Sequence, residues 1–212
     1  MACMEDVLDI YEWQYDEKYP VVCMDEQPTQ LVKETRPPLP CEVGKPAKYG
    51  YEYERNGTAN NFMFTEPLAG WRKVSVRERK TKIDWAEEIK ALLDEDYPDA
   101  ELVILMCDNL NTHTLGALYE AFDPAEAKRL ADRLDIRYTP KHGGWLNVAE
   151  IELSVLTKQC LARRISDISK LRRETAAWAR HLNNAQTGVD WHFTSKNART
   201  RLNRLYPQVQ LN

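Results

Sequence analysis

One stretch of the sequence, Glu101 to His113, constrains the fold more than any other. Residues 102–107 within it are apolar without interruption, and the run stops abruptly at Asp108. A continuous apolar run of this length is typical of a strand that is buried on both faces of a sheet. In open α/β sheets, ligands bind just beyond the carboxyl ends of such strands. We therefore expect Asp108 to lie at a functional edge of the sheet.

Composition narrows the class of protein. The chain has 212 residues, of which 43% are hydrophobic and 29% charged, which is ordinary for a soluble globular protein of one domain with appendages. No apolar run approaches the roughly 18 residues of a membrane span, and the first residues lack the layout of a signal peptide. The five cysteines are odd in number and never spaced as C-x-x-C, which disfavours a disulfide framework or a structural zinc site. We expect a cytoplasmic protein without a membrane partner.

Charge is unevenly distributed along the chain. The net charge is −4, but the segment from Val155 to the C-terminus carries eleven basic and three acidic residues, a net +8. The first 154 residues therefore carry −12. This asymmetry fits a polyanion-binding surface next to an acidic, cation-binding centre. A solvated basic helix face is the open alternative.

Hydrophobic spacing and turn residues predict the remaining elements. In chain order these are a helix over 4–18, a strand over 21–25 resuming over 30–35, a proline-rich loop over 36–48, a short strand over 49–54, an Asn56-Gly57 hairpin turn, an antiparallel pair over 58–66 and 72–78, a helix over 82–94, the strand over 102–107, helices over 115–121 and from 124, a strand over 136–138, and helices over 147–160, 168–183 and 198–205. Three antiparallel strands followed by helix, strand, helix, strand and helix predict an α/β protein. Its mixed central sheet would be flanked by helices, in the order of the ribonuclease-H-like fold.

Two further carboxylates accompany Asp108. Asp25 follows the apolar run VVCM, which makes it a second strand-terminal aspartate, and Glu150 lies near the start of the helix predicted from Asn147. Glu150 stands three residues after Asn147, so it could equally close a capping box. Clustered carboxylates without cysteine or histidine select hard cations such as Mg²⁺ or Mn²⁺, and they suit two-metal phosphoryl transfer.

Several short motifs, in the right order over nearly the whole chain, carry a family resemblance. They are MDEQ around Asp25, RNGTANNF at 55–62, CDNLNTH at 107–113, YTPKHGGWLNVAE at 138–150 and CLARR at 160–164. In these motifs the chain resembles the catalytic domain of bacterial insertion-sequence transposases of the mariner-related "six-thirty" group. The resemblance implies a DDE triad of Asp25, Asp108 and Glu150 that binds two Mg²⁺ (or Mn²⁺) ions. It also implies cleavage of DNA at transposon ends and transfer of the freed 3′-hydroxyl to target DNA, with no small-molecule substrate.

Other motif residues are expected to support the triad. Asn109, His113 and Asn147 flank it and would orient ligands or DNA, as residues around metal ligands commonly do. His113 could instead be a helix-start histidine with a satisfied hydrogen bond. Lys141 and His142 precede the glutamate helix and are expected to meet a phosphate backbone. Trp145 is expected to pack in the core rather than to stack on a base.

Four arginines in the basic segment are further candidates for contact with the DNA backbone: Arg163, Arg164, Arg172 and Arg173. The first two could instead pair with surface acids. A second enzyme class, an aspartyl phosphatase, would require an acid two residues after Asp25, where this chain has Gln27. A DNA-binding relic of a transposase that no longer cuts is the remaining alternative.

The sequence divides into three expected regions: a linker-like helical segment over 1–18, a catalytic domain over 19–165 with an arm and hairpin insertion over 36–57, and a basic helical extension over 166–212. Transposases of this kind carry a helix-turn-helix region before the catalytic domain. The first catalytic strand begins about twenty residues from Met1, so we expect no such region here. Either the chain is a truncated or split-off catalytic part, or it has lost sequence-specific binding. A homodimer is conceivable, but this departure puts dimerisation in doubt.

Overall fold

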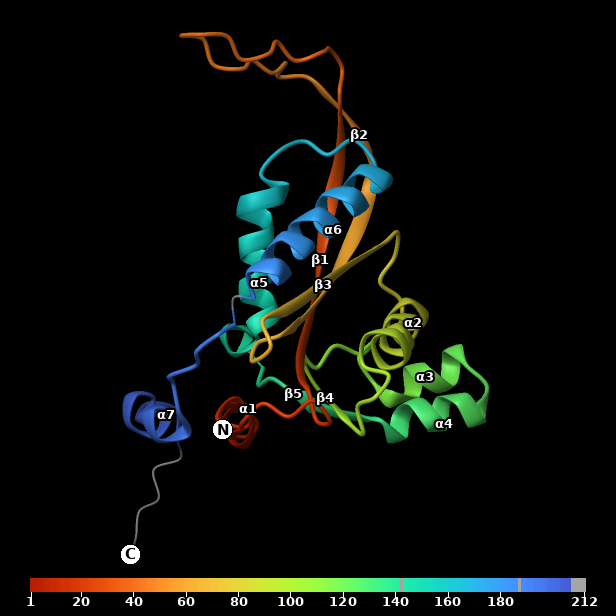
Figure 1. Ribbon diagram of the computed structural model, residues 1–212, viewed down its shortest axis with the longest axis vertical. Coiled ribbons are helices and arrows are strands. Elements are labelled where there is room, and N and C mark those ends of the chain that lie inside the picture. The colour runs from red at the N-terminus through yellow and green to blue at the C-terminus, as the bar shows by residue number, and fades with distance from the viewer. Residues whose placement is uncertain (142, 187, 207–212) are drawn as a thin grey trace, which may run out of the picture.

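A five-stranded mixed sheet forms the centre of the molecule in a computed structural model that describes residues 1–141, 143–186 and 188–206 (Figure 1). Its strand order is β3-β2-β1-β4-β5. In chain order the elements are α1 (Ala2–Tyr11), β1 (Val21–Glu34), β2 (Tyr53–Glu66), β3 (Trp71–Arg77), α2 (Lys82–Ala91), the π-helical turn η1 (Leu92–Asp96), β4 (Val103–Cys107), α3 (Leu115–Ala121), α4 (Pro124–Asp132), β5 (Leu134–Tyr138), the short 3₁₀ helix η2 (Gly144–Leu146), α5 (Val148–Leu156), the π-helical turn η3 (Thr157–Leu161), α6 (Ile168–Ala185), α7 (Ser195–Arg201) and the 3₁₀ helix η4 (Asn203–Leu205). The predicted architecture, three antiparallel strands followed by two parallel ones, is confirmed.

The apolar run in β4 is explained by burial on both faces of the sheet. Ile104 and Met106 point into one hydrophobic cluster, and Val103, Leu105 and Cys107 point into another. Helices α1, α5, α6 and α7 contribute to the first cluster, and α2, α3 and α4 to the second. With helices on both faces, each position of β4 has to be apolar.

Strand β1 is longer than the sequence predicted. It pairs in parallel with β4 only over Val21–Cys23 and continues to Glu34 as an antiparallel partner of β2. The expectation that Asp25 ends a strand is therefore wrong. Asp25 lies within β1, at the point where β1 extends beyond the carboxyl end of β4. Long antiparallel pairing with β2, which the local sequence does not reveal, carries the strand onward.

The predicted hairpin turn at Asn56-Gly57 is also wrong. Both residues lie within β2, opposite the register shift between Gln30 and Val32 of β1. Gly57 has a φ of +87°, a conformation that suits glycine at a β-bulge. The predicted strand over 58–66 lies within β2, whereas the strand predicted over 49–54 is wrong for residues 49–52, which precede β2.

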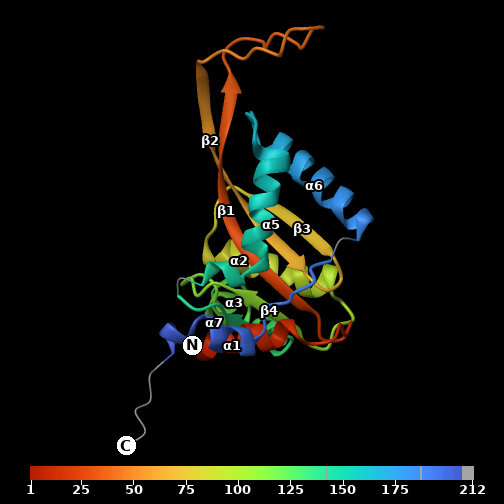
Figure 2. The same ribbon diagram turned by 90° about the vertical axis from the view of Figure 1, so that its left-hand side faces the viewer.

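The proline-rich segment 35–52 joins β1 to β2. Figures 1 and 2 show that it lies at the far end of the β1–β2 ribbon, beyond α5 and α6. Two isolated backbone bridges, Leu39 to Lys48 and Glu42 to Lys45, hold the two sides of the arm together. Val43 at its tip is fully exposed.

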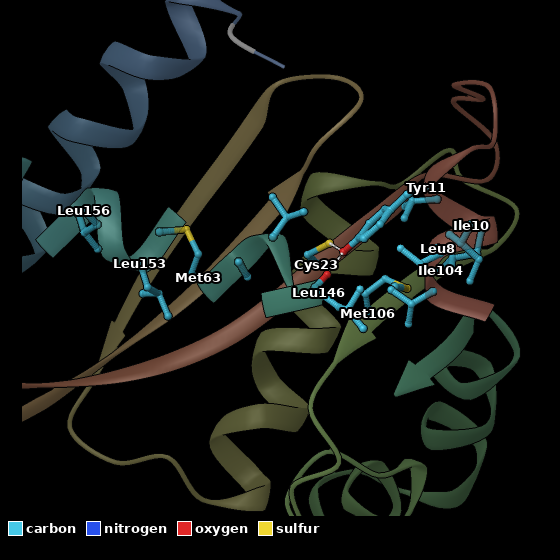
Figure 3. Close-up of a cluster of buried hydrophobic side chains, with 14 of the residues drawn as sticks. Leu8, Ile10, Tyr11, Cys23, Met63, Ile104, Met106, Leu146, Leu153 and Leu156 are labelled. Atoms are coloured by element: carbon cyan, nitrogen blue, oxygen red, sulfur yellow. Dashed lines mark hydrogen bonds between the residues drawn. The ribbon is translucent and has the colours of Figure 1, made fainter. Parts of the chain in front are cut away.

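Helix α1 is shorter than the helix predicted over 4–18 and is packed tightly against the sheet. Its buried side chains belong to the same core cluster as Cys23 and Met106: Met4, Val7, Leu8, Ile10 and Tyr11. The Tyr11 hydroxyl donates a hydrogen bond of 2.7 Å to the Leu146 carbonyl oxygen and lies 3.2 Å from Cys23 Sγ (Figure 3). The first helix therefore supports the segment that leads into α5. The division into three regions stays a prediction.

The C-terminal elements return to the body of the fold. Helix α6 packs against β3, and α7 lies beside α1 in both views (Figures 1 and 2). Arg199 of α7 forms an ion pair of 2.8 Å with Glu5 of α1. No helix in the described part of the chain is long and apolar enough to cross a bilayer.

A buried ion pair fixes α5 to the sheet. The guanidinium of Arg72 on β3 donates two hydrogen bonds of 2.8 Å to the carboxylate of Glu152 on α5, and both side chains are buried. We predict that Arg72→Met lowers the free energy of unfolding by about 3–5 kcal/mol, because Glu152 is left charged and unpaired in the interior. Urea denaturation measures this loss.

Two controls sharpen that prediction. Replacing both partners, Arg72→Met with Glu152→Leu, should recover most of the lost stability, because no buried charge remains. Lys18→Met breaks an exposed ion pair with Glu101 and should cost far less. Equal losses from Arg72→Met and Lys18→Met would contradict the structural role of the pair.

Candidate active site

The three predicted triad carboxylates line one cavity of about 690 Å³. Asp25 comes from β1, Asp108 follows directly after β4, and Glu150 lies in the first turn of α5. The parallel register of β1 and β4 brings the two aspartates to the same edge of the sheet. The sequence prediction that these three acids are neighbours is therefore met in the structure, and their catalytic role stays a prediction.

The electrostatics of Asp25 reflect this neighbourhood. Burial raises the pKa of its carboxyl, and repulsion by Asp108 and Glu150 adds to the rise, so that the pKa reaches about 6. A hydrogen bond of 2.7 Å from the backbone N–H of Glu26 opposes the shift. A divalent cation among the three carboxylates would relieve this repulsion.

The carboxyl of Glu150 is not used as a helix cap. The side chain of Asn147 caps α5 by accepting a hydrogen bond of 3.1 Å from the Ala149 backbone N–H. The backbone N–H of Asn147, which a capping box would give to Glu150, donates instead to the Gly144 carbonyl oxygen at 2.8 Å. The capping-box alternative is therefore wrong, and the exposed Glu150 carboxylate is available to the cavity.

The donor set fits a hard divalent cation. Three carboxylates from separate elements, with Asn109 beside them, offer only oxygen ligands of the kind that Mg²⁺ and Mn²⁺ prefer. Among the described residues, no three Asp, Glu, His or Cys side chains converge closely enough to hold one ion in this conformation. The carboxylate of Asp108 faces His113, with Oδ1 2.8 Å from the ring Nδ1.

His113 belongs to a buried charged network that the sequence did not reveal. Its ring Nε2 lies 3.1 Å from Glu26 Oε1, and the Lys80 ammonium lies 3.5 Å from the other Glu26 oxygen. The ring stacks against Trp85 with 5.8 Å between centroids, and only 1% of the side chain is exposed. Burial alone would lower the pKa of His113. Hydrogen bonds that the ring donates to Asp108, Cys107 and Glu26 outweigh that effect and raise the pKa to about 12.

Strand alternation explains why Glu26 was missed. Successive side chains of β1 point to opposite faces, so Asp25 and Glu26 lie on different sides of the sheet. Asp25 faces the cavity and Glu26 faces His113 and the helix that carries Trp85. The available signal was the acidic doublet in a strand, which places one acid on each face.

Two residues fix the start of α5 relative to the sheet. The buried amide of Asn147 donates a hydrogen bond of 2.9 Å to the carbonyl oxygen of Met24, the residue before Asp25. Gly144 leaves space for the Glu150 carboxylate, because a Cβ on Gly144 would lie 2.1 Å from Glu150 Oε2. Asn147 thus joins the elements that carry Asp25 and Glu150, and Gly144 leaves room for the carboxylate.

The remaining predicted residues are two that precede α5, Lys141 and His142, and four arginines of the basic C-terminal segment. Lys141 is exposed and lines the cavity together with Asn109, whereas His142 lies outside the described residues. Arg163 pairs with Glu174, and Arg164 pairs with Glu34 at 2.6 Å while lying over the Tyr53 ring.

The other two arginines, Arg172 and Arg173, are exposed on α6, and Arg172 donates to the Val76 carbonyl oxygen at 3.1 Å. Contact of Arg163, Arg164, Arg172 and Arg173 with DNA stays a prediction. The expectation that Trp145 packs in the core is wrong. Its side chain, on the short helix η2, is 47% exposed and packs edge-on with the ring of Phe193.

Comparison with protein families matches residues 20–172 to the DDE superfamily endonucleases. The chain belongs to this family. No curated protein matches the chain. The chain is also similar to the crystal structure of the Mos1 mariner paired end complex with Mn, with 14% identity and a TM-score of 0.57 over 88% of this chain and 56% of that one. The crystal structure of the catalytic domain of Mos1 mariner transposase gives 12% identity and a TM-score of 0.56, over 88% of this chain and 83% of that one.

These likenesses confirm the ribonuclease-H-like fold predicted from the sequence. The chain spans little more than half the length of the first of these proteins. The finer assignment, to bacterial insertion sequences of the "six-thirty" group, stays a prediction.

The role of Asn147 can be tested through stability. We predict that Asn147→Ala lowers the free energy of unfolding by about 2 kcal/mol, because it removes a helix cap and leaves the buried Met24 carbonyl oxygen without this donor. Thr194→Ala is the matched control, since Thr194 caps α7 and makes no such bridge to the sheet. Equal losses in the two variants, measured by urea denaturation, would show that the bridge to β1 contributes nothing.

Proposed function

We propose that this chain is the catalytic domain of a transposase that cuts and joins DNA strands with the help of divalent metal ions. The observation that carries the proposal is the meeting of Asp25, Asp108 and Glu150 in one cavity of a DDE superfamily endonuclease. These three carboxylates would hold two Mg²⁺ or Mn²⁺ ions. Bound ions of this kind supply Lewis-acid stabilisation of the attacking and leaving oxygens in phosphoryl transfer.

Each carboxylate has its own structural support. Asp108 follows a strand buried on both faces, and His113 orients its carboxylate while Glu26 holds the other ring nitrogen. Asn147 sets Glu150 against β1 by its bond to the Met24 carbonyl oxygen. Burial of β4 thus supports Asp108 and the Asn147 bridge supports the helix start that carries Glu150, whereas among the described residues the three carboxylates do not converge closely enough to hold one ion in this conformation.

The DNA substrate is inferred from the site and from the similar structures. The Mos1 structures include paired end complexes with Mn and with Mg, and a strand transfer complex. By this likeness we propose that transposon ends and target DNA are the substrates, water the first nucleophile and the freed 3′-hydroxyl the second. Lys141, His142 and Asn109 would position the phosphate backbone near the carboxylates.

Further parts of the proposal concern the transposable element that the chain would serve and the place where it would act. We propose that the chain serves a bacterial insertion sequence and acts in the cytoplasm on nucleoid DNA. The homodimer is left as an expectation from the sequence. The exposed arginines of α6, Arg172 and Arg173, are offered as contacts to DNA further from the cavity. The alternative of a non-cutting relic is less well supported, because all three carboxylates are present and line the same cavity.

The triad is tested directly by a substitution that removes one charge. We predict that Asp108→Asn reduces Mg²⁺-dependent nicking of supercoiled plasmid by more than about 100-fold, a larger loss than groups around metal ligands produce. Asp99→Asn, at an exposed aspartate outside the cavity, should retain full activity. EDTA should abolish nicking by the unmodified protein. Undiminished nicking by Asp108→Asn, at an unchanged melting temperature, would refute the triad.

Gly144 provides a test that does not depend on activity. We predict that Gly144→Ala weakens Mn²⁺ binding about tenfold, because the new Cβ displaces the Glu150 carboxylate. Isothermal titration calorimetry measures the affinity. Gly116→Ala is the matched control, since a Cβ there meets only ordinary contact with Thr114. The same Mn²⁺ affinity in both variants would argue against Glu150 as a ligand.

A further inference from the structure

A second cavity of about 450 Å³ adjoins the first, and the two share Asp25 and Glu150 in their linings. One wall is formed by residues 25–27 of β1. The other is formed by α5 and η3 through Glu150, Leu153, Ser154, Thr157 and Lys158. We call this second cavity the β1–α5 groove. Both views show α5 running alongside β1 (Figures 1 and 2).

Helix geometry places a cation at the far end of this groove. Glu150, Ser154 and Lys158 are spaced four residues apart, so they lie along one face of the helix. The π-helical turn η3 (Thr157–Leu161) begins one residue before Lys158, and such turns are frequent at functional sites. Lys158 is the one cation among the described residues that line the groove.

The lysine is available for a ligand. Lys158 is exposed, and it takes part in none of the ion pairs found within 1–141, 143–186 and 188–206. By contrast, Arg163 and Arg164 shortly after it both pair with carboxylates. The Lys158 ammonium is therefore free to contact an anionic ligand.

The floor of the groove is fixed. The side chains of Gln27 on β1 and Thr157 on η3 hydrogen-bond to each other at 3.1 Å. This contact ties the π-helical turn to the strand that carries Asp25. The distance between Lys158 and the carboxylates is therefore set by a packed helix and strand rather than by a loose loop.

We propose that the β1–α5 groove carries a DNA strand away from the carboxylates, and that Lys158 contacts one of its phosphates. The inference rests on the proposed function, since it takes the substrate to be DNA. Lysine binds phosphate as a point charge, which suits a backbone contact without sequence preference. With Lys141 in the first cavity, the strand meets a cation on either side of the triad.

The salt dependence of DNA binding tests the contact. We expect Lys158→Gln to make the plot of log affinity against log salt less steep by about 0.9 for duplex DNA, or about 0.7 for a single strand. The probes are a short mixed-sequence duplex and its separated strand. All proteins carry Asp108→Asn and are measured with Mg²⁺ by fluorescence anisotropy, so that cleavage does not interfere. Lys158→Arg should restore the slope.

The matched control is Lys128→Gln, which removes the same charge from an exposed position on α4 and should leave the slope unchanged. An unchanged slope in Lys158→Gln would overturn the inference, as would a loss that Lys158→Arg fails to restore. A fall in melting temperature specific to Lys158→Gln would also contradict it. These failures are separate from failure of the triad, because plasmid nicking by the Asp108→Asn variant tests the proposed function alone.

Discussion

The parallel pairing of β1 with β4 is the constraint on which the site depends. Three residue pairs, ending at Cys23 and Met106, fix the two strands in register. Beyond that point β4 stops at Cys107, while β1 continues with β2 as its partner. Asp25 and Asp108 therefore each lie two residues beyond the last parallel pair, at the same edge of the sheet. Because β4 is buried on both faces, this edge is held by the two largest hydrophobic clusters of the molecule.

The two faces of β1 carry acidic side chains in different electrostatic environments. On one face, Asp25 is repelled by Asp108 and Glu150, which makes the cavity favourable for cations. On the other face, the buried carboxylate of Glu26 requires compensation, and His113 and Lys80 supply it. His113 also reaches Asp108, so one positively charged ring joins the interior network to the edge of the cavity. The orientation of Asp108 is thus coupled to the packing of α2 through Trp85.

Local sequence patterns correctly predicted the strands and helices whose formation depends on neighbouring residues in the chain. The apolar run before Asp108 indicated a strand buried on both faces, and helical spacing located α3 without error. The hairpin signal at Asn56-Gly57 failed because long-range pairing with β1 turned it into a bulge within β2. The ambiguity at Glu150 was resolved by a hydrogen bond to the Gly144 carbonyl oxygen, which no propensity encodes. Glu26 and Lys158 could not be placed, because their importance depends on which element packs opposite them.

Ion pairs within the fold neutralise part of the charge of the C-terminal segment. The C-terminal segment carries a net +8, yet several of its arginines are neutralised by acids from elsewhere in the fold, as in Arg164 with Glu34 and Arg199 with Glu5. Pairing of this kind stabilises the docking of the extension and reduces the field that it presents to solvent. Lys141 lines the cavity of the three carboxylates and Lys158 lines the groove beside it, and contact of either with DNA stays a proposal. The charge at these cavities therefore depends on which side chains the fold brings together, and the net charge of a chain segment does not reveal it.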